Sequence, residues 1–242
     1  MSITQDQSSI IHPFNILIVS DSRGKRLENH ISEALHELGN NSITVTVVPH
    51  SGATITALLS PTIDLISATQ YHVVIVMAGV NNLTTLNRAA NGKTRISPKY
   101  YEVGNLVDCM VKQYESFKQE FTYATKGKQC LLFTELIGAN YSQWNKVIND
   151  YPVEQAVINE SIPLINQILW AMNKDTGFPG PHLQNSVHEL VKGKRVHKYK
   201  RMPDGLHADL KTAKVWAKLI ARNAIVIQRM YSARTFSNPI QN

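Results

Sequence analysis

The chain has 242 residues, of which 43% are hydrophobic and 18% are charged, with a formal net charge of +7. This composition is typical of a globular protein and excludes a disordered chain or a coiled coil. Cys109 and Cys130 are its only cysteines, which excludes a disulfide scaffold and cysteine-rich zinc modules and favours a reducing, cytoplasmic location. The longest apolar run, residues 73–80, is far shorter than the roughly 18 residues of a membrane span. Residues 1–14 lack the pattern of a secretory signal.

Short apolar runs alternate along the chain with stretches of helical periodicity. Residues 14–20 form a continuous apolar run that predicts a strand buried on both faces, and residues 24–38 predict an amphipathic helix after it. The same patterns predict strands at 42–49, 71–79 and 129–136, and long helices at 99–124 and 153–173. Pro163 predicts a kink or a break in the second long helix.

The last predicted helix begins near Asp209 and separates its two faces most clearly. Apolar side chains share one face, and basic side chains share the opposite face: Ala213, Trp216, Ala217, Ile220, Ala224 and Ile227 against Lys211, Lys214, Lys218 and Arg222. Such a helix packs on a sheet and faces water. The alternation of strands and helices predicts a mostly parallel sheet covered on both sides, with ligands bound beyond the carboxyl ends of the strands.

Residues that could supply a nucleophile or hydrogen-bond donors follow the first three predicted strands. The sequence SDSRG at 20–24 places Ser22 where a strand turns into a helix, whose N-terminal amides favour a developing oxyanion. The backbone N–H of Gly52, in PHSGAT, is open to close approach by a ligand, and Asn81, in MAGVNNL, supplies an amide donor. Read alone, each motif is more typical of an ordinary turn or helix N-cap.

A fourth motif precedes the final helix. Asp204 and His207 lie three residues apart, in a loop that a parallel sheet brings to its ligand-binding edge. A carboxylate that fixes the tautomer of an imidazole, which then takes a proton from a serine, is the arrangement of a nucleophilic triad. The alternative is that Pro203-Asp204-Gly205 simply forms a turn.

Together, SDSRG, SGAT, AGVNN and DGLH resemble, in this order and at these strand ends, the motifs of the SGNH (GDSL-type) hydrolases. The resemblance runs from Ser20 to His207. It implies a three-layer α/β/α sandwich, flavodoxin-like, with a five-stranded parallel sheet. It further implies that Ser22 is the nucleophile, His207 the general base and Asp204 its orienting partner. The oxyanion hole would consist of the backbone N–H groups of Ser22 and Gly52 and the side-chain amide of Asn81.

Two positions depart from the family pattern. Ser20 stands where the family usually has Gly, and Asn82 stands where it usually has Asp. Neither residue is the nucleophile, the general base, its orienting partner or an oxyanion donor, so activity is still expected. An α/β-hydrolase is disfavoured, because that fold places its nucleophile in G-x-S-x-G and separates its Asp and His widely.

The remaining segments predict the outline of the molecule. Residues 14–231 are expected to form a single domain between polar tails at 1–13 and 232–242. Residues 84–100 read as a long polar connection, and residues 138–152 carry Tyr141 and Trp144, two candidate wall residues of the site. For both segments the alternative is a surface or packing role without function.

Most of the net charge comes from one segment. Residues 192–201 hold six Lys or Arg, which leaves 19 basic against 18 acidic residues elsewhere. Its Lys194, Arg195, Lys198 and Lys200 form a candidate polyanion-binding patch near the expected site, or else a solvated loop or edge strand.

Two hypotheses follow from the sequence. The first is a serine esterase without metal or cofactor that hydrolyses small, acetyl-type O-acyl esters through an acyl-enzyme. The alternative is an esterase-like module with weak or no turnover that binds RNA or another polyanion through residues 192–201. Such a module would resemble the esterase-like domains of some retroelement-encoded, RNA-associated proteins.

Overall fold

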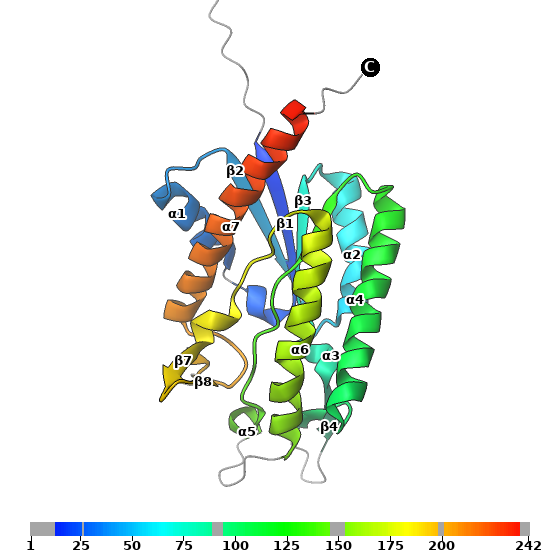
Figure 1. Cartoon of the computed structure of the whole chain (residues 1–242), viewed down its shortest axis with the longest axis vertical. Coiled ribbons are helices and arrows are strands. Elements are labelled where there is room, and N and C mark those ends of the chain that lie inside the picture. Colours follow the sequence, from blue (N-terminus) through cyan, green and yellow to red (C-terminus); the bar gives the residue numbers. More distant parts are fainter. Residues whose placement is uncertain (1–12, 26, 89–93, 146–152, 198–200, 238–242) are drawn as a thin grey trace, which may run out of the picture.

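The computed structural model of the chain describes residues 13–25, 27–88, 94–145, 153–197 and 201–237. A parallel sheet of four strands forms the centre of the molecule (Figure 1), with the strand order β2-β1-β3-β6. Its strands are β1 Phe14–Ser20, β2 Ile43–Pro49, β3 Val73–Met77 and β6 Cys130–Phe133. All four strands predicted from the sequence are therefore confirmed, with small shifts at their ends.

Helices cover both faces of this sheet. On one face lie α1 (Leu27–Glu37) and α7 (Leu210–Ser237), and on the other lie α2 (Ile55–Ala68), α4 (Val103–Thr125) and α6 (Val153–Thr176). Successive residues of β1 enter the two cores in turn, because side chains alternate across a strand: Ile18 packs with α1 and α7, and Val19 packs with α2, α4 and α6. The structure therefore confirms an α/β fold with a parallel sheet between two helical layers.

Helix α7 has the two faces that its sequence predicts. Trp216, Ala217 and Ile220 are buried against the sheet, and the side chains of Lys211, Lys214, Lys218 and Arg222 are exposed. The indole Nε1 of Trp216 donates a hydrogen bond to Ser186 Oγ (2.6 Å). The one polar atom of this buried side chain therefore has a hydrogen-bond partner.

The sequence analysis expects five strands in the parallel sheet. This number is corrected by the structure, because the sheet has four strands in the part of the chain that the structure describes. Asparagine side chains of α6 take the place of a fifth strand along the outer edge of β6. Asn173 bonds both the N–H and the C=O of Phe133, at 2.8 Å each, and Asn166 does the same for Leu136 at 2.7 and 2.9 Å. An edge that is paired in this way leaves no backbone groups for another strand at these residues.

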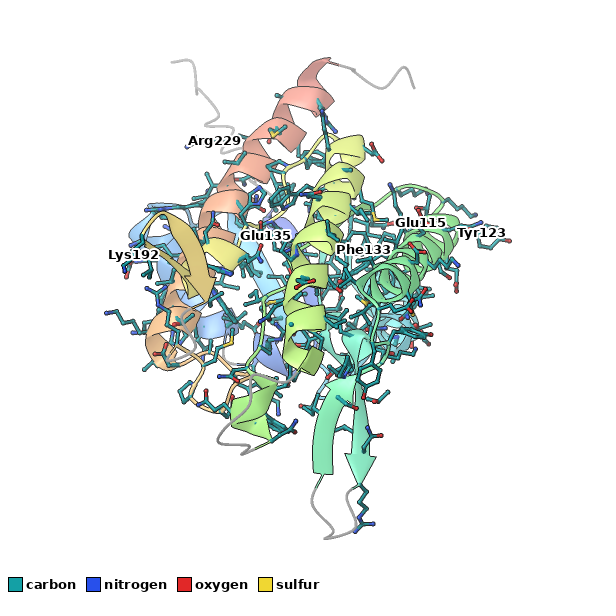
Figure 2. All side chains as sticks on the ribbon, turned by 60° about the horizontal axis from the view of Figure 1, so that its bottom comes forward. Glu115, Tyr123, Phe133, Glu135, Lys192 and Arg229 are labelled. Atoms are coloured by element: carbon teal, nitrogen blue, oxygen red, sulfur yellow. The ribbon has the colours of Figure 1, made fainter. Side chains whose placement is uncertain are left out.

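Three further elements differ from the sequence prediction. Helix α2, which begins after Thr54 and contains Pro61, was not predicted. Helix α6 continues through Pro163, where the sequence predicts a kink or a break, so a break at this residue is wrong. The predicted polar connection at 84–100 is an antiparallel hairpin of β4 (Thr84–Arg88) and β5 (Thr94–Pro98), which projects from the body of the molecule (Figure 2).

Helix α7 extends past residue 231, where the sequence analysis placed the start of a tail. Arg234 donates to the carbonyl oxygens of Thr176 and Gly177 (3.1 and 3.0 Å), and its guanidinium lies 4.2 Å above the ring of Phe178. These contacts attach the last turns of the helix to the end of α6. No helix among the described residues is long and apolar enough to cross a membrane.

Candidate active site

Ser22 lies at the carboxyl end of β1, at the centre of the sheet. It begins a short 3-10 helix, η1 (Ser22–Gly24), whose N-cap is Asp21: the carboxylate of Asp21 accepts a hydrogen bond from Arg23 N at 2.9 Å. Asp21 N in turn donates to Met77 O at the end of β3 (3.2 Å). The tight turn that these bonds hold leaves the Ser22 side chain partly exposed at the ligand-binding edge of the sheet.

The structure brings Asp204 and His207 to this serine. His207 Nε2 lies 2.8 Å from Ser22 Oγ, and His207 Nδ1 lies 2.6 Å from Asp204 Oδ2. The three side chains thus form a continuous series of hydrogen bonds from a carboxylate through an imidazole to a hydroxyl. With Nδ1 donating to Asp204, Nε2 is the free acceptor that can take the serine proton.

Local hydrogen bonds fix the charge and position of Asp204. Its other carboxylate oxygen accepts from the backbone N–H groups of Leu206 (2.9 Å) and His207 (2.7 Å). Partial burial acts to raise the pKa of Asp204, but the hydrogen bonds from His207 and Leu206 outweigh it and leave the pKa below its ordinary value. The carboxylate is therefore charged at neutral pH. The stability that these bonds contribute is present above the ordinary pKa and is lost as the pH falls through the lowered pKa.

The loop of residues 203–207 is held in place by the segment that precedes and forms α5 (Tyr141–Trp144). Asn140 N donates to Gly205 O (2.7 Å), and Gln143 Nε2 donates to Pro203 O. Gly205 has φ of +86°, and a Cβ there would lie 2.2 Å from Asn140 O, so this close approach requires glycine. These contacts cannot be predicted from the sequence, because no local pattern links residues 140–143 with residues 203–205.

Trp144, from the same segment, lies beside the imidazole of His207. Its ring centre lies 6.3 Å from that of His207, at an angle of 61°, and its side chain is partly exposed. The structure thus places Trp144 beside the site, whereas Tyr141 is buried in the core. Asn145 completes this connection: its amide accepts from Ile96 N and donates to Ile96 O of β5, at 2.8 Å each.

The two loops that carry Gly52 and Asn81, the other two predicted oxyanion donors, are bonded to each other and to β1. His50 N donates to Ser20 O (2.8 Å), and Asn81 Nδ2 donates to Ala53 O (3.0 Å). Gly52 has φ of +75°, and a Cβ there would meet no atom within 4 Å, so its backbone borders open space. The Asn81 amide has a second N–H that remains for a ligand. Ser22, Gly52 and Asn81 thus follow neighbouring strands at one edge of the sheet.

The two residues that depart from the family pattern both pack under this site. Asn82 is buried, and its side chain accepts from Ile55 N (2.9 Å) at the start of α2 and donates to Gln113 Oε1. Ser20 is fully buried against Gly24, where a Cβ would lie 1.8 Å from Ser20 Oγ, and that hydroxyl has no partner among the described residues. The bonds of Asn82 connect the loop after β3 with the start of α2.

We predict that Asn81→Ala lowers kcat by about 10²–10³ with little change in KM, because an oxyanion donor acts on charge that develops in the transition state. Steady-state kinetics on a small neutral ester measure this, and thermal melting checks that the loss of the bond to Ala53 leaves the fold intact. Asn87→Ala is the matched control, because Asn87 is an exposed amide of β4 that bonds only Ser97 in the described structure. A loss confined to KM would assign Asn81 to substrate binding.

Residues 192–197 of the basic segment belong to a second hairpin, which consists of β7 (His188–Val191) and β8 (Lys194–His197). Its turn is Lys192-Gly193, and Figure 2 shows Lys192 at the outer margin of the molecule. Lys194 and Arg195 belong to β8, and Lys198 and Lys200 lie outside the described residues. Binding of a polyanion by these four side chains therefore stays a prediction.

The fold is that of a known class of proteins, the GDSL-type lipases and acylhydrolases. A lipase/acylhydrolase from Enterococcus faecalis superposes with a TM-score of 0.59 at 15% identity, over 86% of this chain and 94% of that one. An acetylxylan esterase from Geobacillus stearothermophilus gives a TM-score of 0.57 at 15% identity, over 88% and 95% of the two chains. A GDSL-like lipase from Bacteroides thetaiotaomicron gives 0.55 at 13% identity, over 87% of each.

These likenesses confirm, at the level of the fold, the resemblance to SGNH hydrolases that the four motifs indicate. No sequence-family model matches the chain, and comparison with curated proteins finds no significant match. At 13–15% identity these structures show the fold alone, and an activity follows only from the geometry of the site.

Proposed function

We propose that the protein is a serine ester hydrolase of the SGNH type, which cleaves small O-acyl esters through an acyl-enzyme. The observation that carries this proposal is the series of hydrogen bonds from Asp204 through His207 to Ser22, at 2.6 and 2.8 Å. Its position at the carboxyl edge of the sheet, in a fold shared with acylhydrolases and acetylxylan esterases, supports the same reading.

In the proposed reaction Ser22 Oγ attacks the ester carbonyl carbon while His207 Nε2 takes the hydroxyl proton. The resulting oxyanion is bound by the N–H groups of Ser22 and Gly52 and by the amide of Asn81. His207 then protonates the departing alcohol, which leaves an acyl group on Ser22. A water molecule, deprotonated by His207, releases the carboxylic acid and restores the serine. Asp204 keeps its negative charge throughout and stabilises the imidazolium.

The fold shared with acetylxylan esterases supports a small acyl group as the group that is transferred to Ser22. A cavity of about 10 Å³ next to η1 is bordered by Arg23, Met77 and Ile137, and Arg23 Nη1 donates to Ile137 O at 2.9 Å. Neither Ser22 nor His207 borders this cavity, so it does not set the size of the acyl group.

A series of p-nitrophenyl esters from acetate to octanoate tests the proposed acyl size. We expect kcat/KM to be highest for acetate and to fall at least about tenfold by butyrate, since a single methylene that a pocket cannot hold costs that much. The Ser22→Ala variant, run in parallel, gives the rate of any hydrolysis that does not use the proposed nucleophile. A rate that rises with chain length would contradict the small-acyl proposal, and equal rates in the two proteins would contradict the esterase itself.

A further inference from the structure

A second cleft lies away from the triad, between the end of α6 and the segment that follows it. Its volume is about 300 Å³, at the lower end of the range for small-molecule sites. Ring side chains form much of its lining, which includes Trp170, Lys174, Phe178, Pro179, Gly180 and His182. None of the three triad residues borders this cleft.

A buried carboxylate holds the two rings at the margin of the cleft. Glu135 is 5% exposed (Figure 2), and its Oε1 accepts from Trp170 Nε1 (3.1 Å) and lies 3.0 Å from His182 Nδ1. Its Oε2 accepts from Gln184 N at 2.7 Å. The rings of Trp170 and His182 meet edge to face, with their centres 5.5 Å apart. Both rings are thereby fixed in one orientation.

This arrangement contributes little to the core. A buried carboxylate costs free energy that its hydrogen bonds offset only in part. The rings that it orients stay 42% exposed in Trp170 and 56% exposed in the side chain of His182, so they bury little apolar area in return. Preorganised, half-exposed rings are instead typical of a surface that binds a ligand.

The charges at the cleft favour an anion. Lys174 borders it and forms no ion pair within the described part of the chain, whereas the neighbouring Asp175 faces outward and pairs with Lys118 (3.6 Å). A metal ion is not favoured, because the described residues contain no group of three metal-ligating side chains.

We propose that this cleft binds a small planar monoanion of the aromatic carboxylate class, with its ring against Trp170 and its carboxylate paired with Lys174. The two flat rings select a planar ligand, and Lys174 selects its charge. The site is separate from the proposed esterase chemistry and does not depend on it.

Isothermal titration of the full chain with benzoate at low salt tests this proposal. Benzamide keeps the ring without the charge, and cyclohexanecarboxylate keeps the charge without the flat ring. We expect benzoate to bind with a stoichiometry of one, and benzamide to bind about tenfold more weakly or worse, because the charge-assisted contact is absent. Cyclohexanecarboxylate is expected to bind more weakly than benzoate as well.

Variants locate the binding. Lys174→Gln and Trp170→Leu should each weaken benzoate binding by about tenfold. Lys214→Gln, which removes an exposed charge of α7 far from the cleft residues in sequence, and Ser22→Ala should bind benzoate like the wild type. Thermal melting confirms that every variant is folded. Absence of benzoate binding to the wild type at millimolar concentration, or equal binding by Lys174→Gln, Trp170→Leu and the wild type, would overturn the proposal.

Discussion

Ser22→Ala is expected to abolish hydrolysis of p-nitrophenyl acetate while the protein stays folded. The Ser22 hydroxyl is the only atom of its side chain that the proposed chemistry uses, and it lies 2.8 Å from His207 Nε2. The side chain is half-buried at the surface of the site, so its truncation leaves no cavity in the core. Initial rates before and after correction for spontaneous hydrolysis measure the loss, and the melting temperature checks the fold.

Ser20→Ala provides the matched control for that variant. Ser20 stands two residues earlier on the same strand, but its hydroxyl is fully buried and has no partner among the described residues. Its removal should therefore keep the activity and leave stability unchanged or slightly higher. Full activity of Ser22→Ala, or loss of activity in a folded Ser20→Ala protein, would show that the nucleophile is assigned to the wrong serine.

Asp204→Asn is expected to lower kcat by about 10⁴. An asparagine oxygen still accepts from the N–H groups of Leu206 and His207, which now bond the carboxylate at 2.9 and 2.7 Å, so the loop should keep its shape. The amide, however, carries no charge to stabilise the imidazolium, and its N–H group favours the tautomer whose Nε2 is protonated and unable to accept the serine proton. Steady-state kinetics with the acetate ester, together with the far-ultraviolet spectrum, separate this effect from unfolding.

Asp209→Asn is the corresponding control. Asp209 is a nearby carboxylate that caps α7 through a 2.6 Å bond from Thr212 N, and asparagine caps a helix about as well. Its activity should therefore match the wild type. A loss of less than about tenfold in Asp204→Asn would mean that Asp204 shapes the loop without acting on the charge of His207.

The sequence predicted the parts of the fold that depend on local patterns. The apolar run of β1 and the two faces of α7 are visible in the order of residues alone, and both are confirmed. The site followed from topology, because parallel strands end at one edge and so bring Ser22, Asn81 and the loop of His207 together. Residues that are far apart in the sequence therefore meet at this edge of the sheet.

The sequence did not predict the features that depend on contacts between residues far apart in the chain. The edge of β6 is closed by Asn166 and Asn173, whose amides look like ordinary polar positions of a helix until α6 is placed beside the strand. Helix α6 continues through Pro163, because the turns on both sides of this residue pack on the sheet and hold the helix in place. Glu135 and His182 are 47 residues apart, and no local pattern links them.

Covalent labelling tests the central claim most directly. A fluorophosphonate reacts with an activated serine and forms a stable phosphonyl ester on its oxygen. The sequence has no Lys or Arg before Arg23, so trypsin releases Ser22 in the peptide of residues 1–23, and fragmentation distinguishes it from the other serines there. We expect one equivalent of label on Ser22 of the wild type, and none on this peptide in Ser22→Ala. Stoichiometric label on another residue, or unlabelled Ser22 in protein that still hydrolyses the acetate ester, would contradict the account.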